Sequence, residues 1–293
     1  MKTITQVIQH DGRSNFTRLY PVSDVHIGHR ACDEKAFARY VKQIADDPDG
    51  MWVGIGDYVD AINRSDPRFS TFDLPDWALT REALADIVTA QRDRFLELTA
   101  PIHDKCLALL AGNHEMTISK YYERDAYGEI VAAIARDKGV EMDTLRLDYT
   151  GWMLLKFIRS TGKSSLCRVW MHHGHGGGQL KGAKALKLQR LAWAVDADLI
   201  IHGHVHDAVI SPGHRACVTD SGVAYVRQVH AMITGSFLTS WVKNGASYAE
   251  RAMLFPGYVG SPVVELYPWE ERTTDDGSAI TGFRIPDSIK ITV

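Results

Sequence analysis

The chain has 293 residues, 45% of them hydrophobic and 24% charged, which is ordinary for a soluble globular protein with a large core. Its formal net charge of −3 argues against binding of nucleic acid through bulk positive charge, although it leaves room for a local basic groove. No stretch approaches the roughly 18 apolar residues of a membrane span, and residues 1–15 lack the apolar core of a signal peptide. The four cysteines form no CxxC pair. We therefore expect a cytoplasmic protein with reduced thiols and no membrane partner.

The first part of the chain predicts alternating strands and helices. Apolar runs at residues 17–22, 51–55 and 105–110 predict three buried strands. Apolar residues at helical spacing predict one helix near residues 33–46 and another from about residue 80 to residue 98. This β-α-β-α-β order predicts a mostly parallel sheet flanked by helices.

Beyond a further helix that ends near Gly139, the chain becomes richer in strands. Residues 141–172 hold three strand-like runs, of which the last covers residues 167–171. The remaining predictions are a helix at 181–195, a strand at 199–201, and strand-like segments at 225–234, 263–267 and 280–293. Since no repeat or low-complexity linker divides the chain, residues 1–293 are expected to form one domain. The predicted class is α/β, an α+β sandwich in which two mixed β-sheets pack face to face with flanking helices.

Five short polar segments each follow an apolar run, at the point where a strand ends and a loop begins. They read Asp24-Val25-His26, Gly56-Asp57-Tyr58-Val59-Asp60, Gly112-Asn113-His114-Glu115, His172-His173-Gly174-His175 and Gly203-His204-Val205-His206. In α/β folds, ligands bind at the carboxyl ends of the strands. The segments supply carboxylate, amide and imidazole groups but no thiolate, a donor set that suits Mn²⁺, Fe, Zn²⁺ or Ni²⁺. Together they predict a two-metal site that cleaves phosphoesters.

The order of these segments resembles the calcineurin-like metallophosphoesterase superfamily. The pattern of that family is DxH, GDxxD, GNH[DE], a histidine after a strand, and GHxH, and no ligand position is substituted between residues 24 and 206. The resemblance implies the sandwich fold, two divalent metal ions and hydrolysis of a phosphoester. We expect Mn²⁺ first, with Fe, Zn²⁺ or Ni²⁺ as alternatives.

The resemblance also implies a role for each ligand position. Asp57 is expected to bridge the two metal ions, because a shared carboxylate offsets their repulsion. The other expected ligands are Asp24, His26 and His206 for one ion, and Asn113, His204 and His173 for the other. Alignment on the end of the apolar run selects His172 in place of His173, so both stay open. An Asp-x-His or His-x-His alternation on an extended segment would turn each pair of side chains to one face.

Two further residues are expected to be catalytic. His114 follows the ligand Asn113, and the resemblance places it next to the scissile phosphate, where it would stabilise charge and protonate the leaving oxygen. Asp60 is expected to accept a hydrogen bond from His114 and fix the orientation of its ring. The alternative for Asp60 is the N-cap of a helix that begins just past the loop.

Several polar residues near the motifs are candidates for contact with the substrate. Arg64 and Arg68 follow the GDxxD segment and could hold a phosphate oxygen, and His175 is a further candidate. The glycine-rich run 176–182 lacks the ending of a P-loop and is expected to form a mobile lip over the site. The basic residues between 181 and 190 form either a solvated helix face or a track for a polyanion; they are Lys181, Lys184, Lys187 and Arg190.

The predicted function is metal-dependent hydrolysis of a phosphodiester or nucleotide-type substrate that is small or short. A hydroxide that bridges the metals would attack, and His114 would act as acid or charge stabiliser. The main alternative is a DNA or RNA nuclease of the same superfamily, although no appended DNA-binding segment is visible. A phosphomonoesterase or protein phosphatase is less favoured. So is a non-catalytic scaffold, because the chain keeps every ligand and the catalytic histidine.

Overall fold

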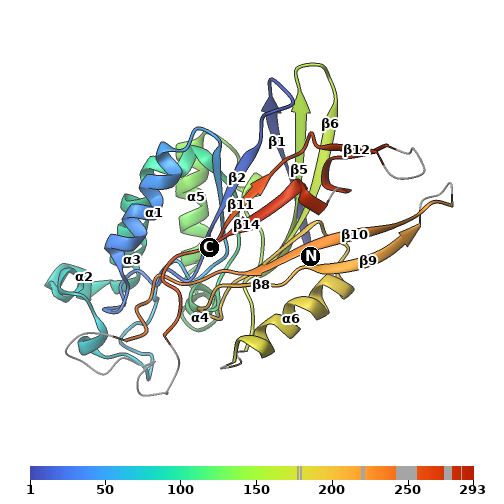
Figure 1. Cartoon of the computed structure of the whole chain (residues 1–293). Coiled ribbons are helices and arrows are strands. Elements are labelled where there is room, and N and C mark those ends of the chain that lie inside the picture. The colour runs from blue at the N-terminus through green and yellow to red at the C-terminus, as the bar shows by residue number, and fades with distance from the viewer. Residues whose placement is uncertain (177, 179, 219–221, 242–255, 274–278, 285) are drawn as a thin grey trace.

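The computed structural model describes residues 1–176, 178, 180–218, 222–241, 256–273, 279–284 and 286–293 (Figure 1). Two mixed sheets carry the fold, as the sequence predicts. The first has the order β14-β11-β2-β3-β4, in which β2, β3 and β4 are parallel and β11 and β14 are antiparallel additions. Its strands are β2 (Thr17–Val22), β3 (Gly50–Gly54), β4 (Cys106–Leu109), β11 (Val263–Leu266) and β14 (Ile289–Thr292).

The second sheet has the order β1-β5-β6-β7-β10-β8, and β9 pairs with β10. Its strands are β1 (Lys2–His10), β5 (Thr150–Arg159), β6 (Ser164–His172), β7 (Leu199–His202), β8 (Val209–Ile210), β9 (Gly213–Val218) and β10 (Ala224–Ile233). A separate short pair consists of β12 (Glu271–Thr273) and β13 (Ala279–Thr281). β6, β7 and β10 run parallel, so their carboxyl ends meet at one edge.

The space between the two sheets is filled by aliphatic side chains from both of them. Leu19 and Val53 of the first sheet belong to one cluster with Leu155, Val169 and Ile201 of the second, and all five are fully buried. Burial of such a side chain stabilises the folded state by about 1.5–3 kcal/mol. This shared core packs the two sheets against each other, so that the strand ends of both sheets lie close together.

Helices lie against the outer faces of both sheets (Figure 1). Phe37 and Ile44 of α1 and Phe95 of α3 pack into a second core cluster together with Trp52 of β3. On the other side, Leu188 of α6 packs in a third cluster formed with the second sheet. The helices are α1 (Glu34–Asp46), α2 (Arg81–Ala85), α3 (Ile87–Thr99), α4 (Asn113–Tyr122), α5 (Ala126–Lys138) and α6 (Lys181–Ala194). The 3₁₀ turns are η1 (Thr71–Asp73), η2 (Asp76–Leu79), η3 (Ala100–Lys105), η4 (Met142–Thr144), η5 (Gly282–Arg284) and η6 (Pro286–Ser288).

Three predicted elements differ from the structure. The helix expected over residues 80–98 is divided, because Asp86 has a non-helical backbone and its carboxylate caps α3 by accepting the amide N–H of Thr89. Residues 141–172 contain two strands and not three, since the segment before β5 forms the 3₁₀ turn η4 and a single parallel bridge between Arg146 and Leu109. The segment 280–293 is no continuous strand, and its described part holds the end of β13, two 3₁₀ turns and β14.

The sequence did not predict β1 (Lys2–His10), which pairs in parallel with β5 along its full length. Its alternating side chains place Ile4 and Ile8 in the shared core, while Val7 points outward and is exposed. In the described part of the chain, no helix combines the length and the apolar character that a bilayer crossing requires.

Candidate metal centre

The predicted ligands lie in loops with an unusual backbone. Asp24, His26, Asp57, His204 and His206 all have positive φ angles, between 50° and 69°. A left-handed conformation costs a residue with a side chain roughly 1–2 kcal/mol. The expectation of an extended segment was therefore wrong, because tight left-handed turns and not β alternation turn these side chains inward. Such strain is concentrated at functional sites, where the surrounding structure holds it in place.

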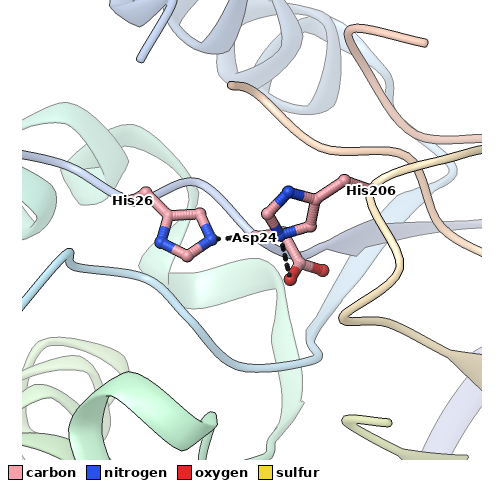
Figure 2. Close-up of side chains that lie close together, drawn as sticks. All are labelled: Asp24, His26 and His206. Carbon is pink, nitrogen blue, oxygen red and sulfur yellow. Dashed lines mark hydrogen bonds and ion pairs between the residues drawn. The ribbon is translucent and has the colours of Figure 1, made fainter. Parts of the chain in front are cut away.

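Asp24, His26 and His206 form the first group of converging side chains (Figure 2). The Oδ1 atom of Asp24 lies 3.1 Å from Nε2 of His206, and this nitrogen lies 3.2 Å from Nε2 of His26. The other carboxylate oxygen of Asp24 accepts the hydroxyl of Ser23 and the amide N–H of His204. Burial acts to raise the pKa of Asp24, but the hydrogen bond and charge of His206 outweigh it and lower the pKa to about 2.

Asp57, His173 and His204 form a second group. Nε2 of His173 lies 3.2 Å from Oδ2 of Asp57 and 3.1 Å from the amide oxygen of Asn113. The opposite nitrogen of His173 donates to the carbonyl of Ile55 at 2.7 Å, which fixes the ring and leaves Nε2 facing the group. Burial acts to lower the pKa of His173, but the Asp57 carboxylate outweighs it and raises the pKa to about 9.

The structure brings His173, and not His172, into this group. Nδ1 of His172 accepts the amide N–H of Gly174 at 2.7 Å. The His172 ring also lies nearly parallel to the ring of His202, with centroids 5.9 Å apart. His172 therefore contacts Gly174 and His202 and is not one of the converging ligands.

Asp57 lies between the two groups. Its Oδ1 atom accepts the amide N–H of His114 at 2.9 Å, while Oδ2 faces His173 and lies 3.8 Å from Nε2 of His26. Asp57 also forms a third convergent set with His26 and His114. A single buried carboxylate thus faces imidazoles from both sides, the arrangement expected of a bridging ligand.

His114 is held by the main chain of Asp60. Nδ1 of His114 bonds the backbone carbonyl of Asp60, whereas the Asp60 carboxylate lies 3.8 Å from the same nitrogen and 3.7 Å from Nδ1 of His26. Burial acts to lower the pKa of His114, but the charges of Asp57 and Asp60 raise it. Asp60 is no helix N-cap, because the next helical turn along the chain begins at Thr71.

The donor set fits divalent cations. Nδ1 of His204 is buried and has no hydrogen-bond partner among the described residues. A buried polar atom without a partner costs about 1–3 kcal/mol, and a metal ion would satisfy it. The groups combine carboxylate oxygens with imidazole nitrogens, which are ligands that Mn²⁺, Fe, Zn²⁺ and Ni²⁺ accept.

The three predicted substrate contacts lie outside these groups. The guanidinium of Arg68 is held by both oxygens of Asp66, at 3.0 Å from Nε and 2.8 Å from Nη2. Arg64 is exposed, and so is His175, whose carbonyl accepts the ammonium of Lys187 at 2.6 Å. Among the described residues, none of the three candidates hydrogen-bonds a predicted metal ligand.

The basic residues of α6 form no continuous track. Lys184 pairs with Asp207 at 3.0 Å, Lys181 lies 3.6 Å from the same carboxylate, and Lys187 binds the carbonyl of His175. A step of three residues also rotates the side chain around the helix, so the four cations spread over different sides. Gly177 and Gln179 of the predicted lip lie outside the described residues.

The family model of the calcineurin-like phosphoesterases matches residues 17–208, more than half of the chain. The chain belongs to the calcineurin-like phosphoesterase family. The matched part contains all five motif segments and every residue of the two ligand groups. No curated protein matches this chain.

Two solved structures are similar to this calcineurin-like phosphoesterase over most of its length. Vps29 of Chaetomium thermophilum is 10% identical with a TM-score of 0.34, and the alignment covers 94% of this chain and 95% of Vps29. The NAD nucleotidase NadN of Haemophilus influenzae is 8% identical with a TM-score of 0.36, covering 91% of this chain and 53% of NadN. TM-scores this low carry no argument about function.

Two residues that support the site were not predicted from the sequence. Ser236 donates its hydroxyl to the carbonyl of Asp24 at 2.8 Å, and the amide of Phe237 donates to the same carbonyl at 3.1 Å. Nothing in the local pattern around Ser236 signals this contact. Glu115, the last residue of the GNH[DE] segment, is fully buried and accepts backbone amides from two loops. A glutamate three residues after Gly112, at a helix start, is the available signal for it.

Proposed function

We propose that this calcineurin-like phosphoesterase hydrolyses a phosphodiester or nucleotide-type substrate with two divalent metal ions. Membership of the family supports metal-dependent hydrolysis of phosphoesters in general. The observation that carries the proposal for this chain is the position of Asp57, whose buried carboxylate belongs to the group of His173 and His204, converges with His26 of the other group, and accepts the amide of His114.

The metal ions would be held by seven side chains. Asp57 would be shared, with the remaining ligands being Asp24, His26 and His206 on one side and Asn113, His173 and His204 on the other. Two such ions polarise the phosphoryl group and lower the pKa of water to generate a nucleophile. Mn²⁺ is the first candidate, and Fe, Zn²⁺ or Ni²⁺ also suit the oxygen and nitrogen donors.

His114 would protonate the leaving oxygen and stabilise developing charge. Because Nδ1 bonds the Asp60 carbonyl, Nδ1 carries a proton and Nε2 is left for the substrate. The raised pKa of His114, in which Asp57 and Asp60 outweigh burial, favours the protonated ring that a general acid needs. Asp60 would orient the ring through its carbonyl and support it through its charge.

A small or short substrate fits the charges of the described surface better than long nucleic acid. Three of the four basic side chains of α6 are close to partners within the protein. Arg68 is a candidate for a non-reacting phosphate oxygen. Its pKa is raised first by Asp66 and to a smaller extent by Asp57 and Asp60, so it lies within electrostatic reach of the site. Arg64 and His175 are candidates for outer contacts, and a nuclease is the alternative.

We further propose that residues 1–293 form one domain and that the protein works in the cytoplasm. The shared core between the two sheets supports the first statement. All four cysteines are free thiols, which supports a reducing compartment.

Hydrolysis of bis-p-nitrophenyl phosphate with added Mn²⁺ tests the proposed reaction. We expect turnover that EDTA abolishes and that exceeds turnover of the monoester p-nitrophenyl phosphate. Single- and double-stranded DNA, assayed in parallel, test the nuclease alternative. A strong preference for the monoester or for long DNA would contradict the proposed substrate class, and no metal-dependent turnover of any substrate would contradict the proposed reaction.

A further inference from the structure

Glu115 lies behind the metal groups and collects backbone amides from two separate loops. Its Oε1 atom accepts the amides of Tyr58 at 2.7 Å and Val59 at 3.2 Å. Its Oε2 atom accepts the amides of Gly112 at 3.0 Å and Asp57 at 3.1 Å. The side chain is fully buried, so these four amides are its surroundings in place of water.

The Asp57 loop is shaped to receive such an anion. Gly56 and Asp57 have successive positive φ angles of 98° and 53°. This conformation turns the N–H groups of residues 57, 58 and 59 toward a single point, which makes an anion-binding concavity of the main chain. Here the carboxylate of Glu115 occupies the concavity.

The Asp57 loop and the Asn113 loop pack tightly against each other at Gly112. A Cβ atom built on Gly112 would lie 2.1 Å from both the amide nitrogen and Oδ1 of Asp57, and 2.7 Å from Oε2 of Glu115. The main chains of the Asp57 loop and the Asn113 loop are therefore in direct contact, and the Glu115 carboxyl group hydrogen-bonds to both of them.

Backbone hydrogen bonds also connect the Asp57 loop to the loop that carries Asp24 and His26. The amides of Val25 and His26 donate to the carbonyl of Asp57 at 2.9 Å and 3.1 Å, and the amide of Ile27 donates to the carbonyl of Tyr58 at 3.0 Å. Residues 57 and 58 thus receive the Asp24–His26 loop on their carbonyl side and Glu115 on their amide side.

We propose that Glu115 is a positioning residue that sets the metal-ligand geometry before any metal binds, by clamping the Asp57 and Asn113 loops to one carboxylate. This inference rests on the proposed two-metal function. It goes beyond that function because Glu115 itself touches neither metal nor substrate. A cap of α4 alone would require only the amide of Gly112. Three of the four donors come from the other loop, which a helix cap does not explain.

Two variants separate anchoring by the carboxylate from simple filling of space. Glu115→Gln keeps the volume but turns an NH₂ group toward amide donors, so two of the four hydrogen bonds are broken. Glu115→Asp keeps an acceptor-only carboxylate and shortens its reach by one methylene. The matched control is Asp125→Asn, the same carboxylate-to-amide change at the N-cap of the next helix, where Asp125 accepts the amide of Gly128 at 2.8 Å.

The measurement is calorimetric titration of the metal-free protein with Mn²⁺, with circular dichroism to verify the fold. Mutation of partners that orient metal ligands typically weakens metal affinity 10- to 100-fold. We expect a loss of that size for Glu115→Gln, a smaller loss for Glu115→Asp and none for Asp125→Asn. Activity of Glu115→Gln should recover partly at saturating Mn²⁺.

Each outcome bears on the proposal. Packing alone predicts the reverse order, with the Gln variant close to wild type and the Asp variant weaker, and that result would overturn the anchoring role. Should Glu115→Gln not fold, Glu115→Asp decides, because Mn²⁺ affinity equal to wild type would then contradict the proposal. Absence of Mn²⁺ binding to the wild-type protein would instead refute the proposed two-metal function.

Discussion

Several residues of this site combine a strained backbone conformation with a proposed role as metal ligands. Five predicted ligands have left-handed backbones, and hydrogen bonds to neighbouring amides or carbonyls fix the main chains of Asp24, His26 and Asp57. Asp57 has the most connections, since it faces both ligand groups and receives the amide of His114. The effects of mutation are therefore expected to differ sharply between residues a few ångströms apart.

Asp57→Asn should lose both metals and activity while keeping the fold. The amide has the same size as the carboxylate but lacks the charge that would offset two cations. We expect much lower metal content by elemental analysis, turnover reduced to background and an unchanged circular dichroism spectrum. Two tightly bound metals with normal turnover would refute the bridging role.

His114→Ala should keep both metals but lose turnover by about 10²- to 10⁴-fold, the usual contribution of a positioned acid or base. The loss should shrink for aryl diesters with very acidic leaving groups, because such leaving groups need no proton. The readout is kcat across a series of leaving groups, together with metal content. An equal loss across the series would assign His114 to charge stabilisation alone.

The sequence predicted the identities of the converging side chains but not how they converge. Order and spacing of the motifs were sufficient to indicate Asp24, Asp57 and His206. The choice between His172 and His173 depended on backbone direction at the end of β6, which no side-chain pattern records. The hydrogen bond from His114 to the Asp60 carbonyl could not be predicted either, because a contact with a main-chain atom leaves no pattern of residue types in the sequence.

At the scale of elements, buried strands were easier to predict than helix boundaries. The strand β2 (Thr17–Val22) agrees with its prediction, because a mainly apolar run of six residues between polar segments is long enough for a strand and too short for a helix. The division of α2 from α3 depends on a single cap at Asp86 within an otherwise helical pattern. β1 was missed because its apolar residues, Ile4, Val7 and Ile8, do not alternate strictly with polar ones.

The helix α6 offers a test of substrate class. Lys181→Gln with Arg190→Gln removes two exposed cations and leaves the internal contacts of Lys184 and Lys187 in place. We expect turnover of the aryl diester to stay within about twofold of wild type. If the helix bound DNA, the slope of log affinity against log salt would fall by about one for each phosphate that the variant no longer neutralises.

The exposed lysine of β5 serves as the matched control, since Lys156→Gln removes a cation from a strand of the second sheet. Salt-sensitive DNA binding that is absent from the helix variant and present in the Lys156 variant would favour the nuclease.

The end of α1 is joined to the first sheet by one carboxylate. Asp47 receives Arg18 at 3.1 Å on both oxygens and the hydroxyl of Tyr20 at 2.7 Å. Burial acts to raise the pKa of Asp47, but Tyr20 and Arg18 outweigh it and lower the pKa. A carboxyl with a depressed folded pKa stabilises the protein above its ordinary pKa, and this contribution is lost as pH falls through the folded pKa.

Asp47→Asn should therefore destabilise the protein at pH 7, by about 1.5–3 kcal/mol for hydrogen bonds to a charged group. The difference from wild type should begin to shrink below about pH 4, the ordinary aspartate pKa, and should vanish only below the lower folded pKa of Asp47, where the wild-type carboxyl also becomes neutral. The measurement is the melting temperature of the wild-type protein and of Asp47→Asn as a function of pH. Asp46→Asn, at a neighbouring exposed carboxylate paired with Lys42, is the matched control and should change stability at pH 7 by no more than about 0.5 kcal/mol.

At the scale of the whole molecule, the site joins the two halves of the sandwich. Its ligands come from loops after β2, β3 and β4 of the first sheet and after β6 and β7 of the second. Asp24, Asp57 and Asp60 are all buried beside imidazoles at the seam between the sheets, where a bound cation would meet several carboxylates. Cations bound there should stabilise the entire fold and not only one loop.

Removal of metal should accordingly lower the melting temperature of the protein. A ligand that binds only the folded state stabilises it by about 2.7 kcal/mol at 100 times its dissociation constant, and each kcal/mol shifts the midpoint by about 2–4 °C for a domain of 150–250 residues. Differential scanning calorimetry in EDTA and in excess Mn²⁺ should therefore differ by several degrees. The shift should be much smaller in Asp57→Asn, which lacks the shared ligand. Identical melting temperatures for the wild-type protein in both conditions would show that the carboxylates at the seam hold no metal.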